Sequence, residues 1–577
     1  FISKLSNRVV DNRSIIKQLK LQAALMELHD ENSFKIRGYQ NAVFHLDKLE
    51  EPLADMSLSS LEQIEGIGKG IAGTIHEIVQ QGTSKAMNEL VSNTPEGIIE
   101  LLDMKGIGPK KIKVLWKELG IESGHELKEA ANSGLVAKLK GFGEKTQESI
   151  IAALAFKEAN ANKLHYAEAE QLAERVIESL ANLGLQASFL GALRRKLEVV
   201  EEIQLLVLTE NFDEAEEKIN ASTEFQQDIK GSGPIKWLGT FDEHLTPISL
   251  LFSKEGDKTK NQLLYSASSQ HLSTPVIDRT TLRELAIRSP QGSEEAFYES
   301  LGMDFILPEL REGTFEVEAA KNKSLPKLVE MSDLKGILHN HSTYSDGKNS
   351  LRDMALYCKE LGYEYLGICD HSKSAFYANG LKEDRVVQQH QEIDELNAEL
   401  APFKVFKGIE SDILYDGQLD YSDDVLASFD FIVASVHSQL KMNKIKATSR
   451  LLAAIENPFT TILGHPTGRL LLRREGYPID HKAVIDHCAK HQVVIEINAN
   501  PWRLDLDWRW VHYAIEQGVM LSINPDAHEK VGYHDMQYGL LTGRKGGLTA
   551  EMTFNALPLS KIEEHFTSRK SLIKANA

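Results

Sequence analysis

The chain has 577 residues, of which 42% are hydrophobic and 26% charged, values typical of a globular protein with several domains. No run approaches the ~18 consecutive apolar residues of a membrane span, and no signal-like leader follows Phe1. Three cysteines are too few for a disulfide framework, so we expect a protein of the reducing cytoplasm. Lys and Arg number 65 against 84 Asp and Glu, and the net charge of −19 by itself argues against nucleic-acid binding. Residues 1–157, however, carry 20 basic and 21 acidic side chains, so the negative excess belongs to the remaining 420 residues.

Residues 1–157 are predicted to be helical, because apolar residues recur at spacings of three and four, as in Ile71, Ile75 and Ile78. Three Gly-x-Gly turns interrupt the helices, each with an apolar residue between the glycines and lysine close behind. Such glycines permit positive φ and leave N–H groups free at a helix N-terminus, where a phosphate can bind. One turn means little, but three copies favour sequence-independent DNA binding through Gly66, Gly68, Lys69, Gly106, Gly108, Lys110, Lys111, Gly141, Gly143 and Lys145.

The middle of the chain mixes helices and strands. A helix with a face of small residues leads to a strand-like run at residues 203–208, residues 251–330 are mixed, and a polar, lysine-bearing stretch at residues 321–327 is typical of a linker.

From Asp333 onward, short apolar runs alternate with helix-length segments, a pattern typical of strands that are buried on both faces. This alternation over about 245 residues predicts a β/α barrel. The seven runs are residues 336–338, 365–369, 404–409, 431–436, 460–463, 493–497 and 519–523.

Histidine or carboxylate side chains follow six of these seven runs, and the carboxyl ends of barrel strands meet on one face. His339 and His341 stand two residues apart, so in an extended segment both rings point to one side. A lone histidine after a strand is usually structural, but so many at one kind of position indicate a metal cluster. Mixed imidazole and carboxylate ligands favour two or three Zn, Mn or Fe ions, a cluster suited to phosphoryl chemistry. The nine candidate ligands are His339, His341, Asp346, His371, Glu410, His437, His465, Asp526 and His528.

These nine residues resemble the complete ligand pattern of PHP (polymerase and histidinol phosphatase) domains. The resemblance implies that His339, His341, Glu410 and Asp526 hold one ion, that His437 and His465 hold a second with Glu410 bridging, and that Asp346, His371 and His528 hold the third. Flanking sequences, among them residues 464–469 and 498–506, resemble the PHP domain of bacterial family X DNA polymerases. Arginines such as Arg469, Arg473, Arg474 and Arg503, together with Lys373, are candidate phosphate contacts.

The family resemblance extends over nearly the whole chain and implies a multidomain α/β protein. It implies a lyase-like helical domain with a helix-hairpin-helix (1–90), a fingers-like helix-hairpin-helix domain (91–157), a polymerase palm (158–255), a thumb-like segment (256–325) and a distorted (β/α)7 PHP barrel (333–577). The lysine that forms a Schiff base in lyase-active members would fall on Thr74, which has no amine.

Residues 191–206 resemble the palm signature of the family, but the residues that bind metal and triphosphate in that signature are replaced. The two metal-binding aspartates of the family correspond to Glu202 and Gln204, and a triphosphate-binding serine corresponds to Ala192. No acidic residue stands near residues 247–251, where the third aspartate is expected. Because Mg²⁺ needs close octahedral geometry from short carboxylates, we expect no Mg²⁺ in this degenerate palm.

The sequence therefore predicts a metal-dependent phosphodiesterase that acts on DNA, a 3′-5′ exonuclease or 3′-end-processing enzyme of DNA repair in the bacterial cytoplasm and nucleoid. Its catalytic residues would be His339, His341, Glu410, Asp526 and Arg469, and its partners gapped, nicked or 3′-ended DNA. Three different functions stay open: an active gap-filling family X polymerase with a PHP exonuclease, a small-molecule phosphatase resembling histidinol phosphatase, and a non-catalytic DNA-end scaffold with structural metals.

Overall fold

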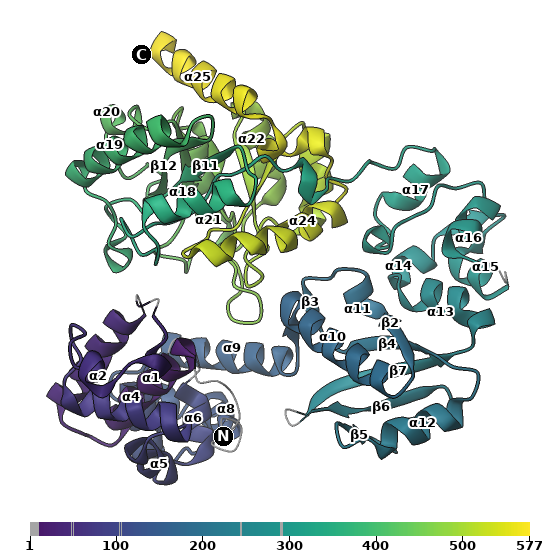
Figure 1. Cartoon of the computed structure of the whole chain (residues 1–577), viewed down its shortest axis with the longest axis horizontal. Helices are drawn as coiled ribbons and strands as arrows, with labels where there is room; N and C mark the ends of the chain where they lie inside the picture. Colours follow the sequence, from purple (N-terminus) through teal and green to yellow (C-terminus); the bar gives the residue numbers. More distant parts are fainter. Residues whose placement is uncertain are drawn as a thin grey trace. The chain divides into compact units, whose positions relative to one another are not determined.

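The computed structural model describes residues 11–47, 49, 51–102, 104, 107–242, 245–288 and 292–576. The chain forms two compact units, Phe1–Ala161 and Asn162–Ala577, and Figure 1 labels their elements. None of the helices described is both long and apolar enough to cross a lipid bilayer.

The first unit is helical, as predicted, and has two apolar cores. One core joins α1, α2 and α4 around Leu19 and Ile75, and the other joins α6 to α9 around Ile112 and Leu127, with α1 contributing Leu25 to the second. The elements are α1 (Asn12–Leu28), α2 (Ser33–Leu46), η2 (Leu53–Asp55), α3 (Leu58–Leu61), α4 (Lys69–Gln81), α5 (Lys85–Ser92), α6 (Glu96–Leu102), α7 (Pro109–Leu119), α8 (Gly124–Asn132), η3 (Val136–Lys138) and α9 (Glu144–Asn160).

Residues 158–255, the predicted palm, contain a mixed sheet in the strand order β2-β4-β7-β6-β5. The central strands β4 and β7 run parallel, with Gln204 opposite Ser249. The palm elements are β1 (Leu164–His165), α10 (Tyr166–Asn182), β2 (Gln186–Phe189), α11 (Gly191–Arg194), β3 (Val199–Val200), β4 (Ile203–Leu208), α12 (Phe212–Ala221), β5 (Phe225–Gln227), β6 (Lys236–Phe241) and β7 (Thr246–Ser253).

Residues 256–325, the predicted thumb, form a small, mainly helical segment with its own apolar core around Phe297 and Ile306. Its elements are η4 (Glu255–Asp257), α13 (Lys258–Tyr265), α14 (Ser269–Leu272), β8 (Pro275–Ile277), β9 (Thr280–Thr281), α15 (Leu282–Arg288), α16 (Glu294–Ser300), η5 (Pro308–Leu310) and α17 (Glu316–Lys321).

The C-terminal part confirms the predicted barrel. Within the described residues, seven parallel strands lie side by side in sequence order, and each predicted run supplies one of them. A bridge between Asn340 and Ala527 brings the segments after the first and the last strand together. The strands are β10 (Gly336–Ile337), β11 (Tyr365–Ile368), β12 (Lys404–Asp412), β13 (Phe431–Ser435), β14 (Ile462–Leu463), β15 (Val494–Asn498) and β16 (Leu521–Asn524).

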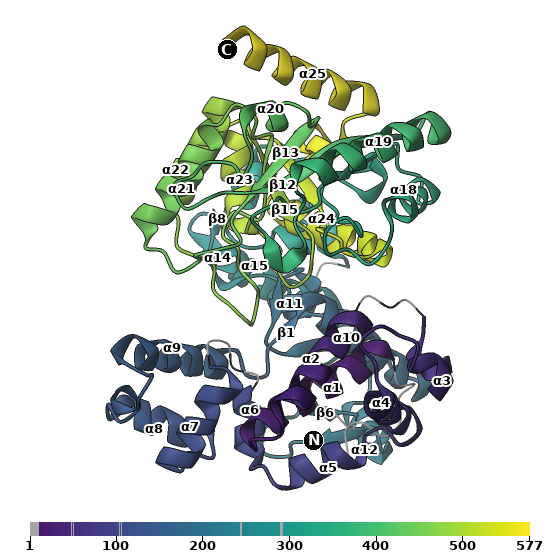
Figure 2. The same cartoon turned by 90° about the vertical axis from the view of Figure 1, so that its left-hand side faces the viewer.

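Helices surround these strands, as Figure 2 shows for β12, β13 and β15. Aliphatic side chains from strands and helices fill the space between the two layers in one large core. The surrounding elements are η6 (Met331–Asp333), α18 (Leu351–Glu360), η7 (Phe376–Ala378), α19 (Glu383–Leu400), α20 (Asp423–Leu426), α21 (Lys444–Glu456), α22 (His481–His491), α23 (Trp508–Glu516), η8 (Lys530–Asp535), α24 (Met536–Lys545), η9 (Ala550–Met552), η10 (Phe554–Ala556) and α25 (Leu559–Asn576).

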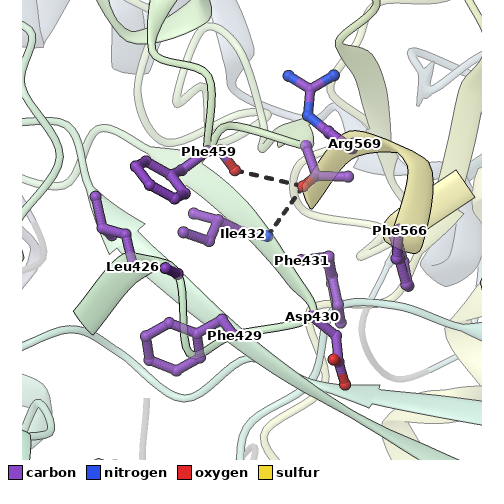
Figure 3. Close-up of a pocket in the computed structure, with 10 residues that line it drawn as sticks. Leu426, Phe429, Asp430, Phe431, Ile432, Phe459, Phe566 and Arg569 are labelled. Atoms are coloured by element: carbon purple, nitrogen blue, oxygen red, sulfur yellow. Dashed lines mark hydrogen bonds between the residues drawn. The ribbon is translucent and has the colours of Figure 1, made fainter. Parts of the chain in front are cut away.

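The end of the barrel where the strands begin is closed by aromatic side chains and by α25. Phe566 of α25 stacks on Phe431, the first residue of β13, with ring centroids 5.1 Å apart. Arg569 donates hydrogen bonds to the carbonyl oxygens of Gln492 and Thr460, and it lines a small pocket with Phe459 and Phe566 (Figure 3). Aromatic packing thus closes this end of the barrel, and the predicted metal ligands follow the opposite ends of the strands.

Candidate metal centre

All nine predicted ligands lie together at the face where the barrel strands end. Glu410, in β12, is at their centre: its Oε1 lies 3.0 Å from His437 Nε2, 3.1 Å from His465 Nε2 and 3.3 Å from His339 Nε2. Its Oε2 lies 2.9 Å from His371 Nδ1. Four histidines from four different strand ends thus contact one buried carboxylate.

The remaining ligands extend the cluster. Asp526 Oδ1 is 3.0 Å from His341 Nε2, and Asp346 Oδ1 is 3.5 Å from His528 Nε2. Ligand atoms lie within 4.8 Å of one another in three overlapping groups that share residues, which suits a multinuclear centre. The groups are His341, Asp346, His371 and His528; His339, His341 and Asp526; and His371, Glu410 and His437.

The residues present fit divalent metal ions. Among the described residues, several buried polar atoms of the cluster make no hydrogen bond of good geometry, although Glu410 Oε2 and His371 Nδ1 lie only 2.9 Å apart: His339 Nε2, His341 Nδ1, His371 Nδ1, His465 Nδ1 and Glu410 Oε2. Burying such atoms without a partner costs free energy, on the order of 1–3 kcal/mol each. Cations bound between imidazoles and carboxylates would remove this cost, and mixed N and O ligands are those that Zn, Mn and Fe accept.

The electrostatics of the cluster point the same way. Burial opposes ionisation, yet the neighbouring imidazoles hold the pKa of Glu410 and of Asp526 well below the usual range. Burial also opposes the charged form of His437 and His528, but nearby carboxylates raise the pKa of His437 to about 10 and that of His528 to about 9. Burial and the neighbours His528 and His371 lower the pKa of His341 to about 3. The carboxylates therefore stay charged and attract cations. Without metal these cations are the protons on the histidine rings, and a metal ion would displace them.

Two further acidic residues, which the sequence analysis did not single out, orient the ligands. Glu496 in β15 accepts a hydrogen bond from His339 Nδ1 at 2.6 Å and from the backbone N–H of His465 at 2.8 Å. Asp412 accepts one from His437 Nδ1. Each bond fixes the tautomer of its histidine so that Nε2 faces the cluster, as outer-shell carboxylates do in metal sites.

Arg469, which was predicted to act in catalysis and to contact phosphate, also has partners within the protein. All three guanidinium nitrogens of Arg469 donate to protein acceptors, the side chain of Asp507 and the carbonyl oxygens of Arg503 and Leu504. Arg469 therefore supports a loop at this face, while its role as a phosphate contact stays a prediction. Arg503 lies closer to the cluster, with its Nε 3.5 Å from Asp526 Oδ2.

The palm positions contain no pair of carboxylates. Gln204 Nε2 donates to Glu202 Oε2 at 2.6 Å, and Ser249 stands opposite Gln204 on β7. The two arginines of the signature have partners in the thumb segment: Arg194 binds Glu294, and Arg195 binds Glu312 at 2.9 Å. None of the groups of potential metal ligands found among the described residues lies in the palm.

The Gly-x-Gly turns of the first unit stand directly before helices. Gly68, Gly108 and Gly143 are the N-caps of α4, α7 and α9, and none of these caps has a side-chain hydrogen bond. Ile67 and Ile107 are buried between their glycines, whereas Lys69, Lys110 and Lys145 are exposed. Lys111 is half-buried beside Phe142, Gly66 and Gly141 have positive φ, and Gly106 lies outside the described residues.

Comparison with known proteins agrees with these observations. Residues 10–84 match a helix-hairpin-helix domain, residues 98–155 a SAM-like helix-hairpin-helix tandem, and residues 338–500 the PHP domain. The DNA polymerase/3′-5′ exonuclease PolX of Bacillus subtilis (strain 168) is 35% identical over 564 residues, which cover 96% of this chain and 98% of that protein. The barrel also resembles a probable phosphatase of Thermoanaerobacter sp. (strain X514), 26% identical over 180 residues, or 30% of this chain and 71% of the relative.

The resemblance seen in the sequence is thus confirmed over nearly the whole length, in the helical unit as well as in the barrel. The chain belongs to the PolX family of DNA polymerase/3′-5′ exonucleases, and its C-terminal barrel is a PHP domain.

Proposed function

We propose that the chain hydrolyses phosphodiesters at DNA 3′ ends, as a metal-dependent 3′-5′ exonuclease, and that its palm no longer polymerises. One observation carries the proposal: nine imidazole and carboxylate side chains converge at one end of the barrel, with buried ring nitrogens left unpartnered among the described residues. The printed name of the Bacillus subtilis relative, a DNA polymerase/3′-5′ exonuclease, supports DNA as the substrate.

The nine side chains would hold two or three divalent ions, which polarise phosphoryl oxygens and offset the negative charge that develops during hydrolysis. The protein contributes orientation. Glu496 and Asp412 keep the ring N–H groups of His339 and His437 on the far side, so their Nε2 lone pairs face the cluster. Arg503 at the rim can donate to a phosphate oxygen, since Asp526, at 3.5 Å, is the nearest carboxylate partner that it has among the described residues.

The helix-hairpin-helix turns would hold the DNA. Uncapped N–H groups at the start of α4, α7 and α9 suit phosphate oxygens, and the exposed lysines beside them add positive charge. Such contacts read the backbone and not the bases, so binding would be independent of sequence.

The loss of polymerase activity is supported by the palm geometry. Nucleotidyl transfer needs carboxylates that hold two metal ions close to a triphosphate. Here Glu202 is hydrogen-bonded to a neutral glutamine, and Arg194 and Arg195 are engaged by Glu294 and Glu312.

Purified chain with added Mn²⁺, Zn²⁺ or Fe²⁺ should shorten single-stranded and gapped DNA from the 3′ end. His341→Ala and Asp526→Ala should abolish shortening, whereas His481→Ala, at the first turn of α22, should not. Failure of every metal to support hydrolysis of any DNA would refute the proposal, and unchanged rates in the cluster variants would favour the scaffold with structural metals.

Two further assays test for a small-molecule phosphatase and for a gap-filling polymerase. Faster hydrolysis of histidinol phosphate than of DNA would favour the phosphatase, an activity that the name probable phosphatase of several barrel relatives also suggests. If the chain incorporates labelled dNTP into a gapped duplex and Glu202→Ala abolishes this incorporation, the result would favour an active gap-filling polymerase.

A further inference from the structure

The loop of residues 372–381, which links the ligand His371 to α19, is held rigidly. Ser374 donates to Asp420 Oδ2 through its backbone N–H at 2.6 Å and to Asp412 Oδ2 through its hydroxyl at 2.9 Å. The backbone N–H of Leu381 donates to the carbonyl of His371 at 2.8 Å. A Cβ on Gly380 would lie 1.9 Å from the carbonyl oxygen of Ser372, so the loop also depends on this close backbone approach.

Two aromatic side chains point out of this rigid loop into solvent. Phe376 is 85% exposed, the highest value among the large hydrophobic residues of the described chain, and Tyr377 is 69% exposed. Their neighbours Ala375 and Ala378 are buried. The loop therefore buries its small residues and presents its two rings, although exposing a phenylalanine forgoes roughly 1.5–3 kcal/mol of burial free energy.

The Tyr377 ring stands at the rim of the metal centre. The centroid of the Tyr377 ring lies 6.2 Å from that of His371, and the two planes meet at 59°. Asp412, Glu410 and Asp346 are close enough to add to the effect of desolvation in raising the pKa of the Tyr377 hydroxyl. Lys382, which directly follows the loop in the sequence, is exposed.

We propose that Phe376 and Tyr377 form a platform on which the base of the 3′-terminal nucleotide stacks while its phosphate lies at the metal centre. This inference rests on the proposed exonuclease function and adds a subsite to it. The platform would take any base, because stacking uses the π-face that all bases share.

A nucleobase of a single-stranded or frayed end fits these observations better than a protein partner. A protein interface calls for a broader apolar core, whereas the described residues of this loop expose two large rings, and the polar residues Asn379 and Lys382 of the same segment are exposed as well. Rings and cationic side chains side by side are the usual composition of single-stranded nucleic-acid sites. Because the backbone beneath is fixed, stacking costs little ordering of the loop.

The first test compares two single-stranded oligonucleotides, one with an ordinary 3′-terminal nucleotide and one whose terminal sugar has no base. The variant Phe376→Ala/Tyr377→Ala should lower kcat/KM on the ordinary end by about 5- to 150-fold, the range expected for one stacked base. It should leave kcat/KM on the abasic end unchanged. Tyr377→Phe, which keeps the ring, should retain activity, and Phe376→Leu, which keeps only apolar bulk, should not.

Val387→Ala is a matched surface control, since Val387 on α19 is 58% exposed and lies outside the loop. A second readout does not depend on catalysis: 2-aminopurine at the 3′ end, joined by a phosphorothioate linkage, should lose emission on binding the wild-type chain but not the double alanine variant.

Equal losses on both ends, or quenching that persists in the double variant, would overturn the platform. If the wild-type chain hydrolyses no DNA but still quenches 2-aminopurine through these two rings, the exonuclease proposal fails while the stacking subsite stands.

Discussion

Glu496 offers the sharpest test of how the metal centre is built, because it touches the ligands from outside the cluster. Its carboxylate is fully buried and accepts hydrogen bonds from His339 Nδ1 at 2.6 Å, from the backbone N–H of His465 at 2.8 Å and from Asn524 Nδ2 at 3.1 Å. In Glu496→Gln the size of the side chain is unchanged, but one acceptor oxygen becomes a donor that must face another donor.

Either orientation of the glutamine weakens the site. If its NH₂ group faces His465, a backbone hydrogen bond is lost; if it faces His339, that ring must accept at Nδ1 and carry its proton on Nε2, where a metal should bind. A hydrogen bond to a charged group contributes about 1.5–3 kcal/mol, which corresponds to roughly 10- to 150-fold in affinity. We therefore expect metal dissociation constants to rise by about one to two orders of magnitude, in line with other outer-shell partners.

The assay is a competition titration of Mn²⁺ or Zn²⁺ against a chelating dye, followed by DNA hydrolysis over a range of metal concentrations. Activity of Glu496→Gln should require more metal and recover in part when metal is saturating. Glu316→Gln is the matched control, because Glu316 Oε1 also lies 2.6 Å from a buried histidine, His271, but in the thumb. Unchanged metal affinity in Glu496→Gln, or an equal loss in Glu316→Gln, would refute the reasoning.

Three further outcomes are expected. Burial lowers the pKa of His271 below its usual 6.5, so the neutral ring, which lies between Glu316 and Tyr298, stabilises the thumb above that pH. Hydrogen exchange of backbone amides in α14 and α16 should therefore accelerate as the pH falls below about 6.5. Exchange that does not depend on pH after correction for intrinsic rates would contradict this expectation. Lys69→Ala and Lys110→Ala should each weaken DNA binding to the same degree for all sequences and reduce the slope of log K against log salt by up to about 0.9, whereas an unchanged slope would exclude a phosphate contact. Removing metal with EDTA should abolish DNA hydrolysis and leave binding by the first unit intact, and parallel loss of both would show that the two functions are not separate.

The barrel was predictable because its signals are local and repeated. Each strand is buried on both faces, so each appears in the sequence as an apolar run, and the ligands follow at strand ends where a barrel must gather them. The short strand β14 was predictable in the same way, since residues 460–463 are apolar or β-branched although only Ile462–Leu463 pair as strand.

The residues that orient the ligands were harder to predict. Glu496 is inside an apolar run, and a buried charge there is the signal that was present, because acidic residues are rarely buried without a partner. Asp412 stands two residues after Glu410 on β12, so the spacing argument that identified His339 and His341 applies to it equally.

Contacts between distant segments could not be predicted from the apolar runs or from the spacing of polar residues. Arg469 has the charge and the position of a phosphate contact, but its three acceptors lie more than thirty residues away in sequence, on Asp507, Arg503 and Leu504. The same holds for Arg194 and Arg195, whose partners in the thumb depend on tertiary packing.

The pairing of Asn340 with Ala527 has a consequence for how this enzyme matures. His341 and Asp526 are 185 residues apart in sequence, and they meet only after the last barrel strand has docked against the first. A partly assembled barrel consequently lacks the complete set of candidate metal ligands. Metal ions that bind only the closed barrel would therefore stabilise it, because they would shift the folding equilibrium toward that form.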